Sequence, residues 1–169
     1  MFVGGVSALV TGCSDVGNRF DGNNRQKVTG YSPRVVSYGS PVPTGGGAYK
    51  LGRPYKVGGR LYTPRHEPNY SRTGIASWYG KDFHGRLTAN GEVYDMHAIT
   101  AAHPTLPLPS FARVTNTRTG QNIVIRINDR GPFAHNRIID LSRRAALKLG
   151  LARSGVGEVH VRYLGPAPL

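Results

Sequence analysis

The second half of the chain contains short runs in which apolar and polar residues alternate. The clearest is Asn122–Ile127, where Ile123, Ile125 and Ile127 occupy every second position. Alternate side chains of a strand point to the same face, so this run predicts a β-strand with an isoleucine face toward a core. Asp129 has the same parity, and we therefore expect its carboxyl to project toward the core side as the strand ends.

Other segments have a similar β-type composition and are bounded by turn residues. They predict strands at residues 75–79, 111–116, 137–141 and 158–164, with a turn at 117–120. Ser142 is a typical cap for a helix over residues 143–149, and Gly150 is a typical stop. Many short strands with one clear helix predict a small, mainly β protein of the barrel type.

The first 73 residues have a different composition. Thirteen of the 23 glycines and six of the 12 prolines lie there, with scattered basic residues and few large apolar ones. Such a sequence buries too little apolar surface to offset the entropy lost on ordering. Residues 13–54 therefore predict a flexible, disordered basic tether. Residues 55–73 are richer in aromatics and predict an irregular strap against a folded domain at 74–165.

The N-terminus carries a short apolar run, MFVGGVSALVTG at residues 1–12, followed by Cys13. The run is too short to span a bilayer, which favours a cleaved signal segment. Val10-Thr11-Gly12-Cys13 resembles the lipobox of bacterial lipoproteins, in which the cysteine becomes the lipidated first residue. An incidental thiol is the alternative, and no Lys or Arg precedes the run as signal segments usually require.

The charge balance narrows the partners. The chain has 22 Lys and Arg against nine Asp and Glu, a formal net charge of +13. Such a balance predicts an anionic partner: nucleic acid, a membrane surface or a cell-wall polymer. No zinc-type Cys/His spacing, phosphate loop or basic platform interleaved with aromatics is present, which argues against nucleic acid. We expect no metal and no cofactor.

The few acids gather beside turn residues. Glu92 and Asp95 follow Asn90-Gly91, Asp129 precedes Arg-Gly-Pro, and His103 lies between the two segments. Clustered carboxylates in a basic protein predict acid/base chemistry on a sugar polymer. The alternative is structural, because Asp and Glu are also common turn and capping residues.

Four linked motifs resemble a known family. They are GIASWYG at 74–80, FHGRLTANGE at 83–92, NDRGPF at 128–133 and RIIDLS at 137–142. Together they resemble rare lipoprotein A, a family of septal-ring lytic transglycosylases. The resemblance implies a six-stranded double-psi β-barrel with one or two short helices. It also implies cleavage of peptidoglycan glycan strands, with a preference for strands stripped of stem peptides, and a catalytic set of Glu92, Asp95, His103 and Asp129.

Roles for these residues follow from the chemistry. A lytic transglycosylase protonates the glycosidic oxygen, passes through an oxocarbenium-like centre and closes a 1,6-anhydro ring on the muramic residue. The acid must stay protonated near neutral pH, so it needs burial or a nearby like charge. We expect Asp129 to be the acid. Glu92 would supply the like charge, stabilise the developing cation or share the proton transfer, and Asp95 would orient substrate hydroxyls or His103. His103 would hydrogen-bond a carboxylate or an N-acetyl group.

Candidate substrate-binding residues surround this set. They are Trp78, Tyr79, His84, Arg86 and Arg130, although core packing is the default for a lone tryptophan. A non-catalytic, expansin-like peptidoglycan-binding module is the alternative function. The expected partners are peptidoglycan and, through lipidated Cys13, the periplasmic face of the outer membrane, including the division site. The expected oligomeric state is a monomer.

Overall fold

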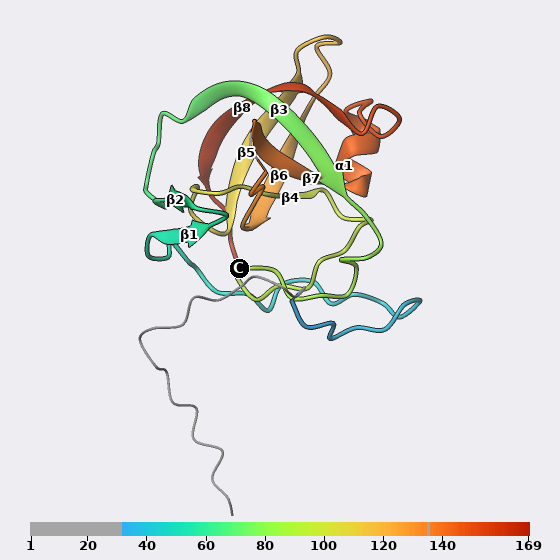
Figure 1. Ribbon diagram of the computed structural model, residues 1–169. Coiled ribbons are helices and arrows are strands. Elements are labelled where there is room, and N and C mark those ends of the chain that lie inside the picture. The colour runs from blue at the N-terminus through green and yellow to red at the C-terminus, as the bar shows by residue number, and fades with distance from the viewer. Residues whose placement is uncertain (1–31, 135) are drawn as a thin grey trace, which may run out of the picture.

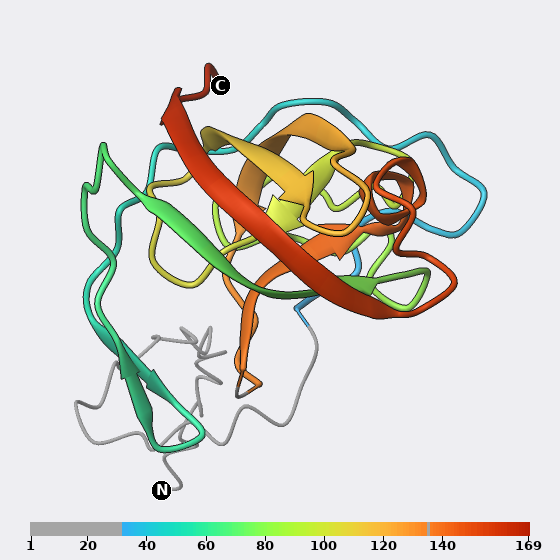
Figure 2. The same ribbon diagram turned by 90° about the horizontal axis from the view of Figure 1, so that it is seen from above.

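The fold is a closed six-stranded β-barrel with a two-stranded hairpin beside it (Figures 1 and 2). The computed structural model describes residues 32–134 and 136–169. In the barrel the strands follow the order β3-β7-β4-β6-β5-β8. Their bounds are β3 (Ser71–Tyr79), β4 (Thr100–Ala102), β5 (Ser110–Asn116), β6 (Asn122–Asp129), β7 (Arg137–Ser142) and β8 (Val156–Pro166). The predicted six-stranded, mainly β barrel is confirmed.

Parallel and antiparallel pairs are mixed around the barrel. β3 runs parallel to β7 and β4 runs parallel to β6, whereas the other neighbours are antiparallel. The β5–β6 hairpin and its turn lie where the alternating pattern predicted them. The sequence analysis did not predict β4, which has only three residues and closes the barrel between β6 and β7.

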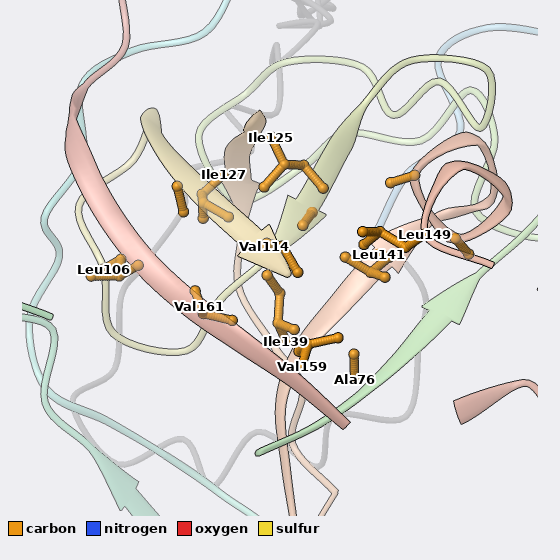
Figure 3. Close-up of a cluster of buried hydrophobic side chains, with 14 of the residues drawn as sticks. Ala76, Leu106, Val114, Ile125, Ile127, Ile139, Leu141, Leu149, Val159 and Val161 are labelled. Carbon is orange, nitrogen blue, oxygen red and sulfur yellow. The ribbon is translucent and has the colours of Figure 1, made fainter. Parts of the chain in front are cut away.

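The barrel interior is filled by aliphatic side chains from every long strand (Figure 3). Ile125 and Ile127 of β6 are almost completely buried, whereas Val124, which directly precedes Ile125, is 47% exposed. This is the predicted isoleucine face. Burying such a side chain contributes about 1.5–3 kcal/mol, so this face fixes the strand's register against a one-residue slip.

A single turn and a half of helix, α1 (Arg143–Lys148), closes one side of the barrel. The Ser142 hydroxyl accepts the Ala145 N–H at 3.2 Å, which satisfies one of the otherwise unpaired first-turn donors. Gly150 follows the helix with a φ of 69°, a left-handed conformation that favours glycine. Both end signals act as the sequence predicted.

Residues 32–54, here called the covering segment, differ from the predicted tether. They follow the barrel surface through backbone hydrogen bonds: Lys50 exchanges two with Leu108, at 2.6 and 2.9 Å, and the Ala48 N–H donates to the Asn90 carbonyl at 2.8 Å. Main-chain pairing holds this segment rather than side-chain burial, which is why its composition did not indicate it.

The region predicted as an irregular strap begins with a regular hairpin, β1 (Tyr55–Val57) and β2 (Arg60–Tyr62). Tyr55 stacks on Tyr62 with ring centroids 5.3 Å apart, and Phe133 packs edge-on against both rings. These contacts join the hairpin to the loop that follows β6. Residues 1–31, including the predicted signal segment and Cys13, lie outside the described residues. Within the described part, no helix has the length and apolar character to cross a membrane.

Candidate active site

Asp129 ends β6 on the face that its parity predicted. Its Oδ1 accepts two backbone N–H groups, from Ala89 and Arg130, each at 2.8 Å. Among the described residues, none donates to the second oxygen, Oδ2. Burial raises the pKa of Asp129 to about 6, against the opposing effect of the two N–H groups and the charges of Arg130 and Lys50. The site therefore holds a buried carboxyl whose raised pKa lies near neutrality and whose Oδ2 accepts no hydrogen bond from the described residues.

Glu92 lies in the opposite electrostatic state. Arg126 contacts both of its carboxylate oxygens, with an Nη2–Oε1 distance of 2.6 Å. Asn90 donates to Oε1 at 2.8 Å and Asn128 to Oε2 at 2.9 Å. Burial acts to raise the pKa of Glu92, but these hydrogen bonds and the charge of Arg126 together lower it. Glu92 is therefore ionised at neutral pH.

The two carboxylates are on opposite faces of β6. Arg126 and Asn128 reach Glu92, whereas Asp129 shares the parity of the buried isoleucines. The charge of Glu92 is not among the causes of the raised Asp129 pKa. The structure therefore gives no support to a like charge from Glu92, and burial is the cause that raises the pKa of Asp129.

Glu92 and Asp95 share a pocket of about 410 Å³. Residues 42–45 of the covering segment and the C-terminal Pro168 and Leu169 form other parts of its wall. The Asp95 carboxylate accepts the His97 N–H at 2.9 Å and lies 3.6 Å from His84 Nδ1. Asp95 and His103 line different pockets, and no contact between them is found among the described residues. The alternative, that Asp95 orients substrate hydroxyls, stays a prediction.

His103 is buried away from the carboxylates, with 1% of its surface exposed. Its Nδ1 accepts the N–H groups of Thr105 and Leu106 at 3.2 and 3.1 Å, and its Nε2 lies 2.9 Å from the Tyr70 hydroxyl. Burial lowers its pKa to about 3, so it is neutral. The expected side-chain bond to a carboxylate is absent among these contacts; instead the His103 main-chain N–H donates to the Asp129 carbonyl at 3.0 Å.

The predicted substrate-binding residues have mostly structural contacts. Trp78 packs against the core, and Tyr79 stacks on Tyr94 at 4.3 Å. His84 is 7% exposed and accepts the Met96 N–H at 3.3 Å.

Two predicted arginines bind carbonyl groups of the protein itself. Arg86 donates to the carbonyls of Asp82 and Ser32, at 2.8 and 2.6 Å. Arg130 donates to three carbonyls, those of His103, Leu106 and Leu51. The Arg130 guanidinium therefore ties the covering segment to the loop after β4, and only its charge acts on Asp129.

Sequence reasoning missed the residues that hold Glu92. Arg126 and Asn128 interrupt the isoleucine run at the opposite parity, and a charged residue inside a strand was the available signal. Their partner lies more than 30 positions earlier, so only the folded register identifies it. Within residues 32–134 and 136–169, no three His, Cys, Asp or Glu side chains gather in an arrangement suited to a metal ion.

Comparisons with known proteins identify the family of the barrel. The family model described as lytic transglycolase matches residues 71–161. The endolytic peptidoglycan transglycosylase RlpA of Neisseria meningitidis serogroup B is 54% identical over 115 residues, covering 68% of this chain and 48% of that protein. The protein of the same name from Vibrio cholerae is 42% identical over 159 residues, covering 92% of this chain and 60% of that protein. A third protein of that name, from Pseudomonas aeruginosa, is 50% identical over 127 residues, covering 75% of this chain and 36% of that protein. The chain spans about half the length of the curated relatives it matches.

Proposed function

This chain belongs to the double-psi β-barrel lytic transglycolase family that includes the RlpA proteins, and from that premise we propose that its barrel cuts peptidoglycan glycan strands without water. The bond cut is the β-1,4 link from N-acetylmuramic acid to N-acetylglucosamine, and the product ends in 1,6-anhydro-muramic acid. The observation that carries the proposal is the Asp129 carboxyl, with a pKa of about 6 and an Oδ2 that no described residue engages.

Asp129 can serve as acid and then as base. Its proton passes to the glycosidic oxygen as the bond from that oxygen to C1 of the muramic residue breaks. The positive charge that develops at C1 is captured by the 6-hydroxyl of the same sugar, whose proton returns to the Asp129 carboxylate. The carboxyl is regenerated, and neither water nor a second acid is consumed. A pKa near neutrality suits both halves of this cycle.

In this proposal Glu92 is a positioning residue and takes no part in proton transfer. Its carboxylate is ionised and held by Arg126, Asn90 and Asn128, so it has no proton to donate. These contacts fix the loop that carries Ala89, whose N–H holds Asp129 Oδ1. Asp95 is about a third exposed on the same pocket, which leaves it able to bind a sugar hydroxyl.

The test is release of glycan products from purified peptidoglycan sacculi, identified by mass. The protein should release fragments that end in anhydro-muramic acid, and Asp129→Asn should lower the rate by about 10²–10⁴-fold while the protein still binds sacculi. Products with reducing muramic acid ends would show hydrolysis instead. Binding without soluble products would favour the alternative, an expansin-like module that loosens the polymer without cutting it.

We also propose that Cys13 carries a lipid anchor and that the barrel works from the periplasmic face of the outer membrane, including the division site. The support is the sequence Val10-Thr11-Gly12-Cys13 followed by Ser14. Cys13→Ala should leave an unprocessed or soluble protein. Unchanged membrane fractionation of that variant would contradict the anchor and leave the glycan chemistry untouched.

A further inference from the structure

A second hollow, of about 320 Å³, lies between the hairpin, the start of β3 and the loop after β4. This volume is at the lower end of the range for small-molecule pockets, about 300–1,000 Å³. Its basic lining residues come from four separate segments: Arg60, Arg65, Arg72 and Arg137. Among the residues that line this hollow, Glu67 is the one acid.

Glu67 holds its two arginines loosely. It lies 3.4 Å from Arg65 and 3.2 Å from Arg72, and those arginine side chains are 60% and 57% exposed. Charge-assisted hydrogen bonds are usually about 2.7–2.9 Å long, so these pairs are weak surface contacts. Both guanidinium groups can turn toward a bound anion at little cost in stability.

The other two arginines differ from each other. Arg137 is balanced by Asp140, 3.3 Å away. Arg60 has no acidic partner in the part of the chain that the structure describes; its guanidinium sits over the Tyr62 ring, 5.4 Å from the centroid. Stacking of this kind orders an arginine without using its hydrogen-bond donors.

The floor of the pocket adds no charge. His103 is neutral because burial lowers its pKa to about 3, and Tyr70 is neutral because burial raises its pKa to about 12. The pocket as a whole therefore has excess positive charge, because Arg65 and Arg72 share Glu67 and Arg60 has no acidic partner among the described residues.

The pocket adjoins the segment that holds Asp129. His103, in its wall, donates its main-chain N–H to the Asp129 carbonyl at 3.0 Å. Pro104, also in the wall, accepts the Tyr55 hydroxyl at 2.7 Å, and the charge of Asp129 contributes to the raised pKa of Tyr55. The wall of the pocket is thus bonded to the main chain of the residue that carries the candidate acid.

We propose that this arginine pocket, formed by Arg60, Arg65 and Arg72, binds a carboxylate of the peptidoglycan strand that is cut at Asp129. The inference rests on the proposed function. Planar guanidinium groups match carboxylates in a two-pronged fashion, which a neutral sugar hydroxyl does not reproduce. The carboxylate belongs either to the lactyl group of a peptide-free muramic residue or to a stem peptide.

The test is calorimetric binding to full-length Asp129→Asn protein, in which turnover is blocked. Three tetrasaccharides serve as probes: alternating N-acetylglucosamine and N-acetylmuramic acid without peptides, the same strand with stem peptides, and chitotetraose, which has no carboxylate. Arg60→Gln with Arg72→Gln should raise the Kd for a carboxylate-bearing strand about tenfold and leave chitotetraose unchanged. Arg118→Gln, an exposed arginine of the β5–β6 turn outside the pocket, is the matched control.

The outcomes separate the alternatives. An effect on the peptide-free strand assigns the pocket to the lactyl group, and an effect on the peptide-bearing strand alone assigns it to the stem peptide. Equal affinity for chitotetraose and both muramic strands, or equal losses in the Arg118 control, overturns the proposal. Binding is read in the Asp129→Asn protein and turnover in the unsubstituted protein. An arginine-dependent preference in the first, with no anhydro product released by the second, would refute the proposed function while supporting this carboxylate site.

Discussion

Replacing Arg126 with methionine tests whether Glu92 is a buried anion stabilised by one cation. The substitution keeps an apolar side chain of about the length of the arginine stem but removes the guanidinium, which contacts both Glu92 oxygens. The two side chains are 20% and 8% exposed. Breaking a buried pair by removing one partner costs about 3–5 kcal/mol. We expect a loss of about 3 kcal/mol at pH 7, the low end, because Arg126 retains some contact with water.

The loss should depend on pH in a defined direction. The lowered pKa of Glu92 means that its stabilising contribution is present above its ordinary value of 4.5 and is lost as pH falls through the folded pKa. Without Arg126, the effect of burial is opposed only by the hydrogen bonds from Asn90 and Asn128, so the pKa of Glu92 rises. As pH falls, Glu92 is then protonated at a higher pH in the variant than in the native chain. The stability gap should then narrow on acidification, by up to about 1.4 kcal/mol per pH unit.

Urea unfolding at pH 7 and pH 4 measures this gap. Glu92→Gln and the Glu92→Gln, Arg126→Met double variant complete a thermodynamic cycle, and the cycle also removes the separate loss of the Arg126 bond to the Pro168 carbonyl. The double variant should be more stable at pH 7 than the sum of the single losses predicts. An additive cycle, or a gap that is the same at both pH values, would refute the electrostatic account of Glu92.

Two further predictions concern the acid and the covering segment. The kcat/KM for glycan release should fall about tenfold per pH unit above the Asp129 pKa of about 6. Lys50→Gln should move this decrease in kcat/KM to higher pH, because the Lys50 charge lowers the pKa of Asp129. If the decrease stays at the same pH, Asp129 is not the titrating group. Gly85→Ala should destabilise the covering segment, by about 1–3 kcal/mol, since φ is 78° and a Cβ would lie 2.2 Å from the Val36 carbonyl oxygen. Gly155→Ala is the control, because Gly155 has a φ of 75° but a Cβ there would have no atom within 4 Å. Thermal unfolding and limited proteolysis of the two variants then separate the steric clash from backbone strain.

The local sequence pattern was enough to predict most of the barrel strands and the helix. Alternation at the β5–β6 hairpin specifies both strand and face, since a one-residue slip would move every isoleucine of β6 to the solvent. The same parity placed Asp129 on the core side, so its raised pKa could be anticipated. Ser142 and Gly150 mark the helix ends by mechanisms that act within one turn.

Features that depend on long-range pairing could not be predicted. The β4 strand contains only a threonine and two alanines, and its position comes from pairing with β6 and β7 rather than from its own pattern. The covering segment is held by main-chain bonds such as those between Lys50 and Leu108, which any residue type can make. His103 was placed beside the carboxylates by resemblance, whereas burial turned its ring toward Tyr70.

Asp129 at the end of β6 and Glu92, which is held by residues on the other face of that strand, should respond to pH in opposite directions. The pKa of Asp129 is raised, so its contribution to stability is complete below its ordinary value of 3.8 and is lost as pH rises through about 6. Asp129→Asn should therefore gain stability relative to the native chain between pH 4 and pH 7. Glu92→Gln should do the reverse at lower pH: its stability relative to the native chain should fall as pH rises from the lowered folded pKa of Glu92 toward 4.5, and the difference should stay constant above that value. Urea midpoints of both variants, measured from well below pH 4 up to pH 8, give these slopes, with Asp82→Asn, an exposed acid, as a reference. Slopes of the same sign would mean that the two carboxylates share one environment, and the assignment of Asp129 as the acid with Glu92 as its support would fail.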